Sequence, residues 1–264
     1  MKLKNFTRDS FFLNSIKLIK LNPGKAALMV LFDASFILSY FSLKKLFEYF
    51  SQPLNPVISS SIFAFFIFSS VYYLAILFVY SFFKYSLLDS VKSLFGKSEF
   101  SFNRLLNFYL LNAIIAAIFF ALMLLLNYIL ISIKQNYAPY VFVFLAVPYI
   151  LFLYVIINIS HSLFYEGCSI IISIKAAFSM AFAKIKSYRE TILVIIICAF
   201  ILLLLFLVID YFIRTPISKN YSSYLTVYSY FKQTSIIVID AVFYFILLTN
   251  RISFYNIVKH GQSS

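Results

Sequence analysis

Long apolar runs bounded by lysine and arginine dominate the pattern of polar and apolar positions along this chain. A helix needs about 20 mainly apolar residues to cross the hydrocarbon core of a bilayer. Six charge-poor runs approach or exceed that length, at residues 26–43, 57–83, 105–133, 138–160, 191–213 and 235–250. Their apolar positions are continuous and do not alternate, which excludes the lipid-facing strands of a barrel. The pattern predicts an all-α polytopic bundle that forms a single integral membrane domain over residues 1–264.

The first and last runs are the shortest, and each contains an aspartate, Asp33 or Asp240. Four spans with two re-entrant or interfacial segments are therefore the structural alternative. The first run starts 26 residues into the chain and no small-residue cleavage pattern follows it, so we expect an uncleaved anchor and not a secretory signal.

Three further segments place apolar and polar residues on opposite sides of a helix, at residues 9–21, 84–95 and 161–190. The third has a narrow polar stripe opposite large apolar side chains, formed by Ser162, Glu166, Ser169 and Ser173. We expect all three to be interfacial amphipathic helices on the cytoplasmic side of the membrane.

Each amphipathic segment leads into a pair of spans, which gives units of similar plan at about residues 1–83, 84–160 and 161–250 and indicates a threefold internal repeat. Set over each other without gaps, Ser15–Leu38 and Ser179–Leu202 share six identities in 24 columns.

Helices such as IKLIKLNPGK and AFAKIKSYRE thus alternate with paired spans. In this layout the whole chain resembles uncharacterised multi-spanning prokaryotic membrane families, notably the membrane region that accompanies some glycerophosphodiester phosphodiesterases. The phosphodiesterase catalytic domain is absent from these residues, so the resemblance implies a helical architecture and no activity.

Composition excludes other classes of protein. Apolar residues make up 63% of the chain, charged residues only 12%, and the mean hydropathy is +0.95. A soluble domain is about half apolar and about a quarter charged, and a disordered chain has few aromatic residues, whereas this one has 34 Phe and 21 Tyr.

The formal net charge of +13 has a membrane explanation. Of the 22 Lys and Arg residues, 16 lie in alternate flanking segments, namely both termini and residues 84–104 and 161–190. The positive-inside rule then predicts a cell-membrane protein with both termini cytoplasmic. We expect anionic lipids as partners, together with other membrane proteins, and no nucleic acid. The candidate lipid contacts are Lys17, Lys20, Lys184, Lys186 and Arg189.

Polar residues inside the spans are the candidates for chemistry, because an acidic residue at the centre of a membrane helix costs about 2.5–3.5 kcal/mol on insertion scales. Asp33 and Asp240, with Asn112 and Asn127 in the third span, form a candidate intramembrane polar site. On the functional interpretation, the aspartates form a proton or cation site between the first and sixth spans. The alternative is that these residues are hydrogen-bonded and hold helices in register.

Catalytic motifs are missing, so we expect neither an enzyme nor a cofactor. His161 and Glu166 are five residues apart and do not share a helical face, and Cys168 and Cys198 match no metal-binding spacing, so no metal site is expected. The sequence favours a lipid- or protein-interacting scaffold or assembly factor. The alternative is a transporter or permease component that uses Asp33 and Asp240.

Overall fold

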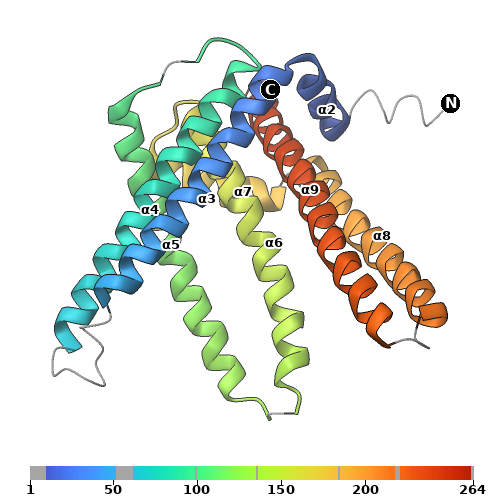
Figure 1. The fold of residues 1–264 in the computed structure, drawn as a ribbon. Coiled ribbons are helices and arrows are strands. Elements are labelled where there is room, and N and C mark those ends of the chain that lie inside the picture. The colour runs from blue at the N-terminus through green and yellow to red at the C-terminus, as the bar shows by residue number, and fades with distance from the viewer. Residues whose placement is uncertain are drawn as a thin grey trace. The chain divides into compact units, whose positions relative to one another are not determined.

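The computed structural model describes residues 10–51, 62–98, 100–134, 136–183, 185–217 and 221–262. Every regular element in these ranges is an α-helix (Figure 1). In chain order they are α2 (Phe11–Leu21), α3 (Pro23–Ser51), α4 (Ile62–Ser93), α5 (Phe102–Ile131), α6 (Ala138–Tyr165), α7 (Ile170–Ala183), α8 (Ile185–Ile217) and α9 (Tyr221–Gln262).

Six of these helices, α3, α4, α5, α6, α8 and α9, are long and apolar enough to cross a membrane. This confirms the predicted all-α, multi-pass class, and the six helices correspond to the six predicted runs. The two short runs lie inside α3 and α9, which are continuous over 29 and 42 residues and favour six spans over four. The first five residues of the run at 57–83 lie outside the described part of the chain.

The helices form two compact units. The central unit comprises residues 18–183, and the terminal unit comprises residues 1–17 together with residues 184–264.

Ring contacts hold the helix pairs of the central unit together. Phe47 of α3 stacks on Tyr72 of α4 with ring centroids 4.1 Å apart. In the next pair, the Tyr149 hydroxyl of α6 donates to the Phe119 carbonyl oxygen of α5 at 2.8 Å, and the two rings lie 5.9 Å apart. Aromatic pairs add about 0.5–1.5 kcal/mol to the area that they bury, so the high Phe and Tyr content supplies much of the pairing between helices.

Burial in the central unit is concentrated at one end. Most of the buried side chains come from the last turns of α4, the first half of α5 and the last turns of α6, which meet because successive spans run in opposite directions (Figure 1). Tyr85, Phe108 and Tyr165 are the largest of them and are at most 1% exposed. We call this region the packed end.

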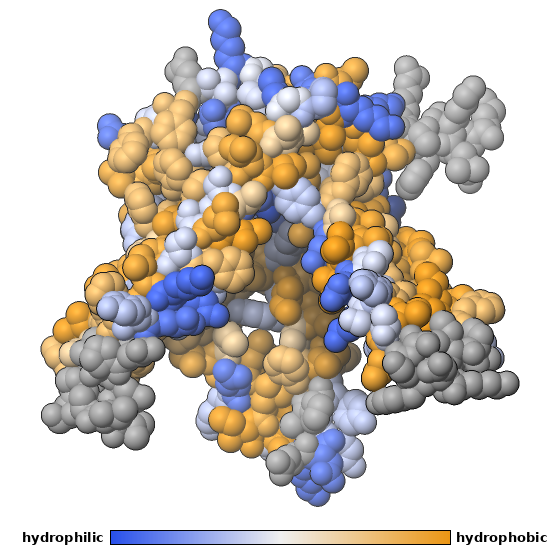
Figure 2. Space-filling view, viewed as in Figure 1, coloured by the Kyte–Doolittle hydropathy of each residue, from blue (hydrophilic) through white to orange (hydrophobic). Residues whose placement is uncertain are grey.

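Most of the remaining span surface is exposed and apolar, as the orange areas of Figure 2 show. In the most apolar stretches of α3 to α6, no more than 11% of residues are buried. Lipid or a partner protein must cover this surface, because exposed apolar patches of this extent are rare in soluble monomers.

The region 161–190 is not one helix, contrary to the expectation. Residues up to Tyr165 continue α6, and Gly167 then adopts a φ of 113°, which favours glycine. The Cys168 amide donates to the Leu163 carbonyl and the Gly167 amide to the Phe164 carbonyl, at 3.2 and 3.1 Å. This is the hydrogen-bond pattern of a Schellman motif, which ends a helix. α7 begins only after this turn.

The polar stripe predicted for this region is divided: Ser162 and Ser173 are buried, whereas Ser169 is exposed. Ser162 and Ser173 are 2% and 0% exposed, whereas Ile171 and Phe182 are 64% and 67% exposed. α7 thus packs its small residues against α6 and α5 and turns its large apolar residues outward. Small residues allow membrane helices to approach closely. This explains why the side of α7 that carries Ser173 is buried.

The other two expected amphipathic segments have different outcomes. Residues 9–21 correspond closely to the separate helix α2. Residues 84–95 form no separate helix, because α4 continues without a break to Ser93 and places Leu87, Leu88 and Val91 in the packed end. The interfacial location of these segments and the threefold repeat stay predictions.

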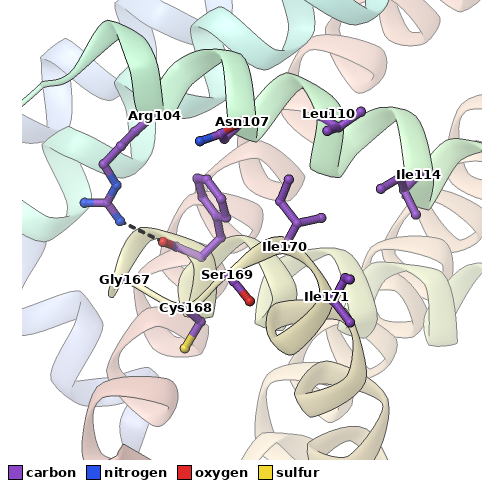
Figure 3. Close-up of a pocket in the computed structure, with 10 residues that line it drawn as sticks. Arg104, Asn107, Leu110, Ile114, Gly167, Cys168, Ser169, Ile170 and Ile171 are labelled. Atoms are coloured by element: carbon purple, nitrogen blue, oxygen red, sulfur yellow. Dashed lines mark hydrogen bonds between the residues drawn. The ribbon is translucent and has the colours of Figure 1, made fainter.

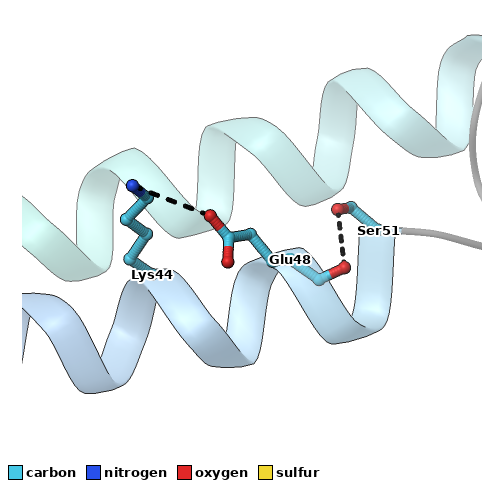
Figure 4. A network of polar contacts seen from close by, with 3 residues as sticks. All are labelled: Lys44, Glu48 and Ser51. Carbon is cyan, nitrogen blue, oxygen red and sulfur yellow. Dashed lines mark hydrogen bonds and ion pairs between the residues drawn. The ribbon is translucent and has the colours of Figure 1, made fainter.

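The far end of α3 is polar. Lys44 Nζ lies 3.7 Å from Glu48 Oε1, and the Ser51 hydroxyl donates to the Glu48 carbonyl at 3.3 Å (Figure 4). Both charged side chains are at least half exposed, so the pair contributes little stability. Lys44 is the first charged residue after the apolar stretch of α3, directly after the predicted run 26–43.

The terminal unit also has its buried residues at one end. The Asn250 side-chain amide of α9 donates to the Thr191 carbonyl of α8 at 3.2 Å. The Ser253 hydroxyl lies 2.9 Å from that of Ser15 in α2, and the Ser10 hydroxyl donates to the Glu190 carboxylate. These contacts join the start of α8, the last third of α9 and the first part of α2.

Candidate functional site

The packed end of the central unit contains a buried chain of hydrogen bonds that crosses three spans. The Asn112 amide nitrogen of α5 donates to the Ser81 hydroxyl of α4 at 2.9 Å. His161 Nε2 of α6 lies 2.7 Å from the Asn112 amide oxygen. All three side chains are at most 4% exposed. Asn112 therefore links α4 to α6.

The direction of each bond follows from the donors and acceptors. The Ser81 hydroxyl donates its only hydrogen to the Leu77 carbonyl at 2.7 Å, so it accepts from Asn112. This places the Asn112 amide oxygen, which can only accept, toward His161. His161 Nε2 must then carry a proton.

The second ring nitrogen of His161 has no such bond. Nδ1 is buried and has no hydrogen-bond partner among the residues that the structure describes. Aromatic rings surround it: the Phe108 ring centroid lies 4.8 Å and the Tyr80 centroid 6.4 Å from the imidazole. In the neutral ring Nδ1 is an acceptor, so one donor or a water molecule would complete its bonding.

Ser81 and His161 do not form a nucleophile and base. Asn112 separates them, and the Ser81 proton is committed to a backbone carbonyl instead of the imidazole. A serine nucleophile needs its base within hydrogen-bond reach. The arrangement braces three spans.

A second polar layer lies about two helical turns closer to the end of α4 and one turn closer to the end of α6. The Tyr165 hydroxyl donates to the Asp89 carboxylate, and the Lys92 ammonium lies 5.5 Å from the centre of the Tyr165 ring. Arg104 of α5 donates from Nη2 to the Phe164 and Tyr165 carbonyls at 2.9 and 3.3 Å. A cation at the end of a helix offsets the partial negative charge of its last carbonyls.

Lys25 has the same role for another helix. Its ammonium donates to the Ser93 carbonyl at the end of α4. Two basic residues of the positive-inside pattern, Lys25 and Arg104, therefore also cap helices at the packed end.

A pocket of about 510 Å³ opens beside this layer. One wall is a face of α5, and the other is the turn after α6 with the start of α7 (Figure 3). The lining residues include Arg104, Asn107, Leu110, Ile114, Ser169 and Ile171.

The predicted intramembrane residues do not all come together. Asn112 is buried in the hydrogen-bonded chain, whereas Asn127 is exposed and lies 15 residues further along α5, about 22 Å at 1.5 Å per residue. Asp33 is half-buried in the central unit, and Asp240 is exposed on α9 of the terminal unit.

The predicted lipid contacts are exposed wherever they are described. Lys17 and Lys20 of α2 and Arg189 of α8 have exposed side chains. Lys184 and the side chain of Lys186 lie outside the described part of the chain. Their contact with lipid stays a prediction.

Sequence reasoning missed Ser81, Arg104 and the Asp89–Tyr165 pair. The signal was present as spacing: Ser81, Tyr85 and Asp89 fall at i, i+4 and i+8 on α4, as do Arg104, Phe108 and Asn112 on α5. Residues at this spacing share a helical face. A polar residue recurring on one face of an otherwise apolar span points to a buried interhelical contact.

No protein family, curated protein or solved structure matches this chain. The described residues contain no group of three or more His, Cys, Asp or Glu side chains that could hold a metal ion.

Proposed function

We propose that this protein is a non-enzymatic integral membrane scaffold or assembly factor that binds anionic lipids on the cytoplasmic side of the cell membrane and presents its spans to lipids or to other membrane proteins. Both termini are cytoplasmic in this proposal. The layout resemblance to poorly characterised membrane families is compatible with it and adds no activity.

One observation carries the proposal: in each unit, the end that holds the buried residues adjoins segments rich in basic residues. In the central unit, the packed end borders residues 84–104 and 161–190. In the terminal unit, the buried contacts lie at the start of α8 and the last third of α9, which include the basic residues Arg189, Arg251 and Lys259.

The parts of the spans outside these buried ends support the proposal that the protein presents its spans to lipids or to other membrane proteins. Their large apolar side chains are exposed, such as Leu124 at 53%, Phe144 at 77% and Leu203 at 57%. The end with the buried residues is well packed and basic, which suits the binding of anionic lipids. The rest of the spans leave apolar surface exposed, which suits contact with lipids or partner proteins.

The proposal is tested by the preference of the purified full-length chain for lipid charge. The chain in mild detergent is titrated with phosphatidylglycerol or with phosphatidylcholine of the same acyl chains, and its thermal midpoint is followed. A ligand at 100 times its dissociation constant stabilises by about 2.7 kcal/mol, which is about 5–10 °C for a chain of this size. We expect that shift with the anionic lipid only, and equal shifts would contradict the proposal.

A further inference from the structure

The pocket beside Arg104 has a polar end and an apolar end. Arg104, Asn107, Leu110 and Ile114 line one wall at i, i+3, i+6 and i+10, so they follow one face of α5 (Figure 3). The ten residue-to-residue steps from Arg104 to Ile114 cover about 15 Å, which is half of the roughly 30 Å hydrocarbon core. The wall thus changes from cationic to apolar over the depth of one leaflet.

The polar end has free capacity to bind an anion. Arg104 uses Nη2 for the two carbonyls at the end of α6, and among the described residues its Nε and Nη1 form no hydrogen bond. Arginine presents several donors in a planar fork that matches phosphate. The guanidinium is held in place by its carbonyl contacts and lines the pocket.

The opposite wall supplies further donors. The Ser173 amide donates to the Ser169 carbonyl at 2.8 Å, so Ser169 is the N-cap residue of α7, and the first amide groups of the helix have no acceptor within it. Ser169 is exposed and lines the pocket, and Ile171 stands 64% exposed on the same wall. This wall repeats the order of the first, with polar groups beside Arg104 and an apolar side chain beyond them.

We propose that this pocket is a specific site for one anionic phospholipid, with the phosphate between Arg104 and the start of α7 and an acyl chain along Leu110, Ile114 and Ile171. The inference rests on the proposed function and deepens it by naming the site and the class of lipid. A volume of about 510 Å³ holds a headgroup and the first part of a chain, and the rest of the lipid extends along the exposed faces of α5 and α7.

Two substitutions test the two ends of the site separately. Ser169→Asp keeps a good helix-capping residue at the start of α7 but adds a negative charge where the phosphate would lie. Leu110→Trp fills the apolar part of the pocket from a residue that is 50% exposed. Lys97→Gln is the matched control, because it lowers the net charge by the same one unit at an exposed position outside the pocket.

The measurement is lipid binding to the full-length chain by native mass spectrometry, with phosphatidylglycerol, phosphatidylcholine of the same chains, and inorganic phosphate as probes. We expect Ser169→Asp to weaken the first phosphatidylglycerol site at least tenfold and to leave phosphatidylcholine binding unchanged. Leu110→Trp should weaken phosphatidylglycerol binding as well, and Lys97→Gln should bind as the wild type does. Circular dichroism and the thermal midpoint establish that each variant is folded, and Ser169→Asp alone decides the matter if Leu110→Trp does not fold.

The outcomes separate the two proposals. If the wild type prefers phosphatidylglycerol but Ser169→Asp binds it equally well, this site is wrong and the proposed function stands. If the wild type shows no preference for anionic lipid, the proposed function fails and the site fails with it. If inorganic phosphate competes fully and Leu110→Trp has no effect, the pocket binds a free anion and not a lipid.

Discussion

The two halves of α5 are both mainly apolar, but their surroundings differ. In the first half Leu105, Phe108 and Leu111 are fully buried, whereas in the second half Phe120 and Leu125 are 64% and 59% exposed. Apolar character does not decide which half is buried, because lipid solvates Leu and Phe as well as a protein core does. The halves differ in their polar residues: Arg104 and Asn112 have partners on α6 and α4, and Asn127 is exposed.

The largest test of this contrast compares two phenylalanines of the same helix. Phe108→Ala removes a fully buried ring that contacts Tyr85, His161 and Phe164, and should cost about 3–5 kcal/mol. Phe120→Ala removes a ring that is 64% exposed and should cost less than about 0.5 kcal/mol. Thermal unfolding of both variants in the same detergent measures the difference, and similar losses would show that the second half of α5 is packed too.

The second test compares the two asparagines. Asn112→Leu leaves the His161 Nε2 proton and the Ser81 oxygen without their partner and should cost about 1–3 kcal/mol. Asn127→Leu makes an exposed position more apolar and should be neutral or slightly stabilising in detergent or bilayer. Equal effects on the thermal midpoint would mean that the hydrogen-bonded chain does not brace the packed end.

A smaller effect is expected at the end of α6. Arg104→Gln removes the cation that donates to the Phe164 and Tyr165 carbonyls and should cost about 0.3–1 kcal/mol. Lys97→Gln, at an exposed position, should have no measurable effect on the free energy of unfolding. Because charge at a helix end is screened by salt, the difference between the two variants should shrink at 1 M NaCl, and a loss of equal size at high salt would assign the role of Arg104 to packing.

The sequence could predict the spans but not their surroundings. Length and hydropathy located all six helices, because a helix that crosses a bilayer must satisfy its backbone internally whatever its neighbours are. The break after α6 depends on Gly167 and the two amides around it, and a single glycine between apolar residues gives a weak signal. The expected amphipathic helix at 161–190 is divided among α6, α7 and α8, and polar Ser173 of α7 is buried. Periodicity shows that a helix has two sides and does not say which one is buried.

The sequence predicted only one residue of the buried hydrogen-bonded chain, because it shows which residues are polar but not which residues they contact. Asn112 was identified as a polar residue within a span, and interhelical bonding was one of its two interpretations. Its partners Ser81 and His161 lie 31 and 49 residues away, and nothing in a single sequence pairs them. Only the way α4, α5 and α6 meet brings them together.

The smallest expected effect concerns the two aspartates, and it separates the proposed scaffold from a transporter. Asp33 is half-buried and Asp240 is exposed on α9, so neither is enclosed as Asn112 is. We expect Asp33→Asn and Asp240→Asn to leave proton and cation flux through proteoliposomes at the level of protein-free vesicles, as for the wild type. Wild-type flux above that level, abolished by either substitution, would establish the transporter alternative, because an amide cannot carry the proton or the charge that such a pathway requires. Flux that survives both substitutions would place any pathway elsewhere and leave the aspartates a structural role.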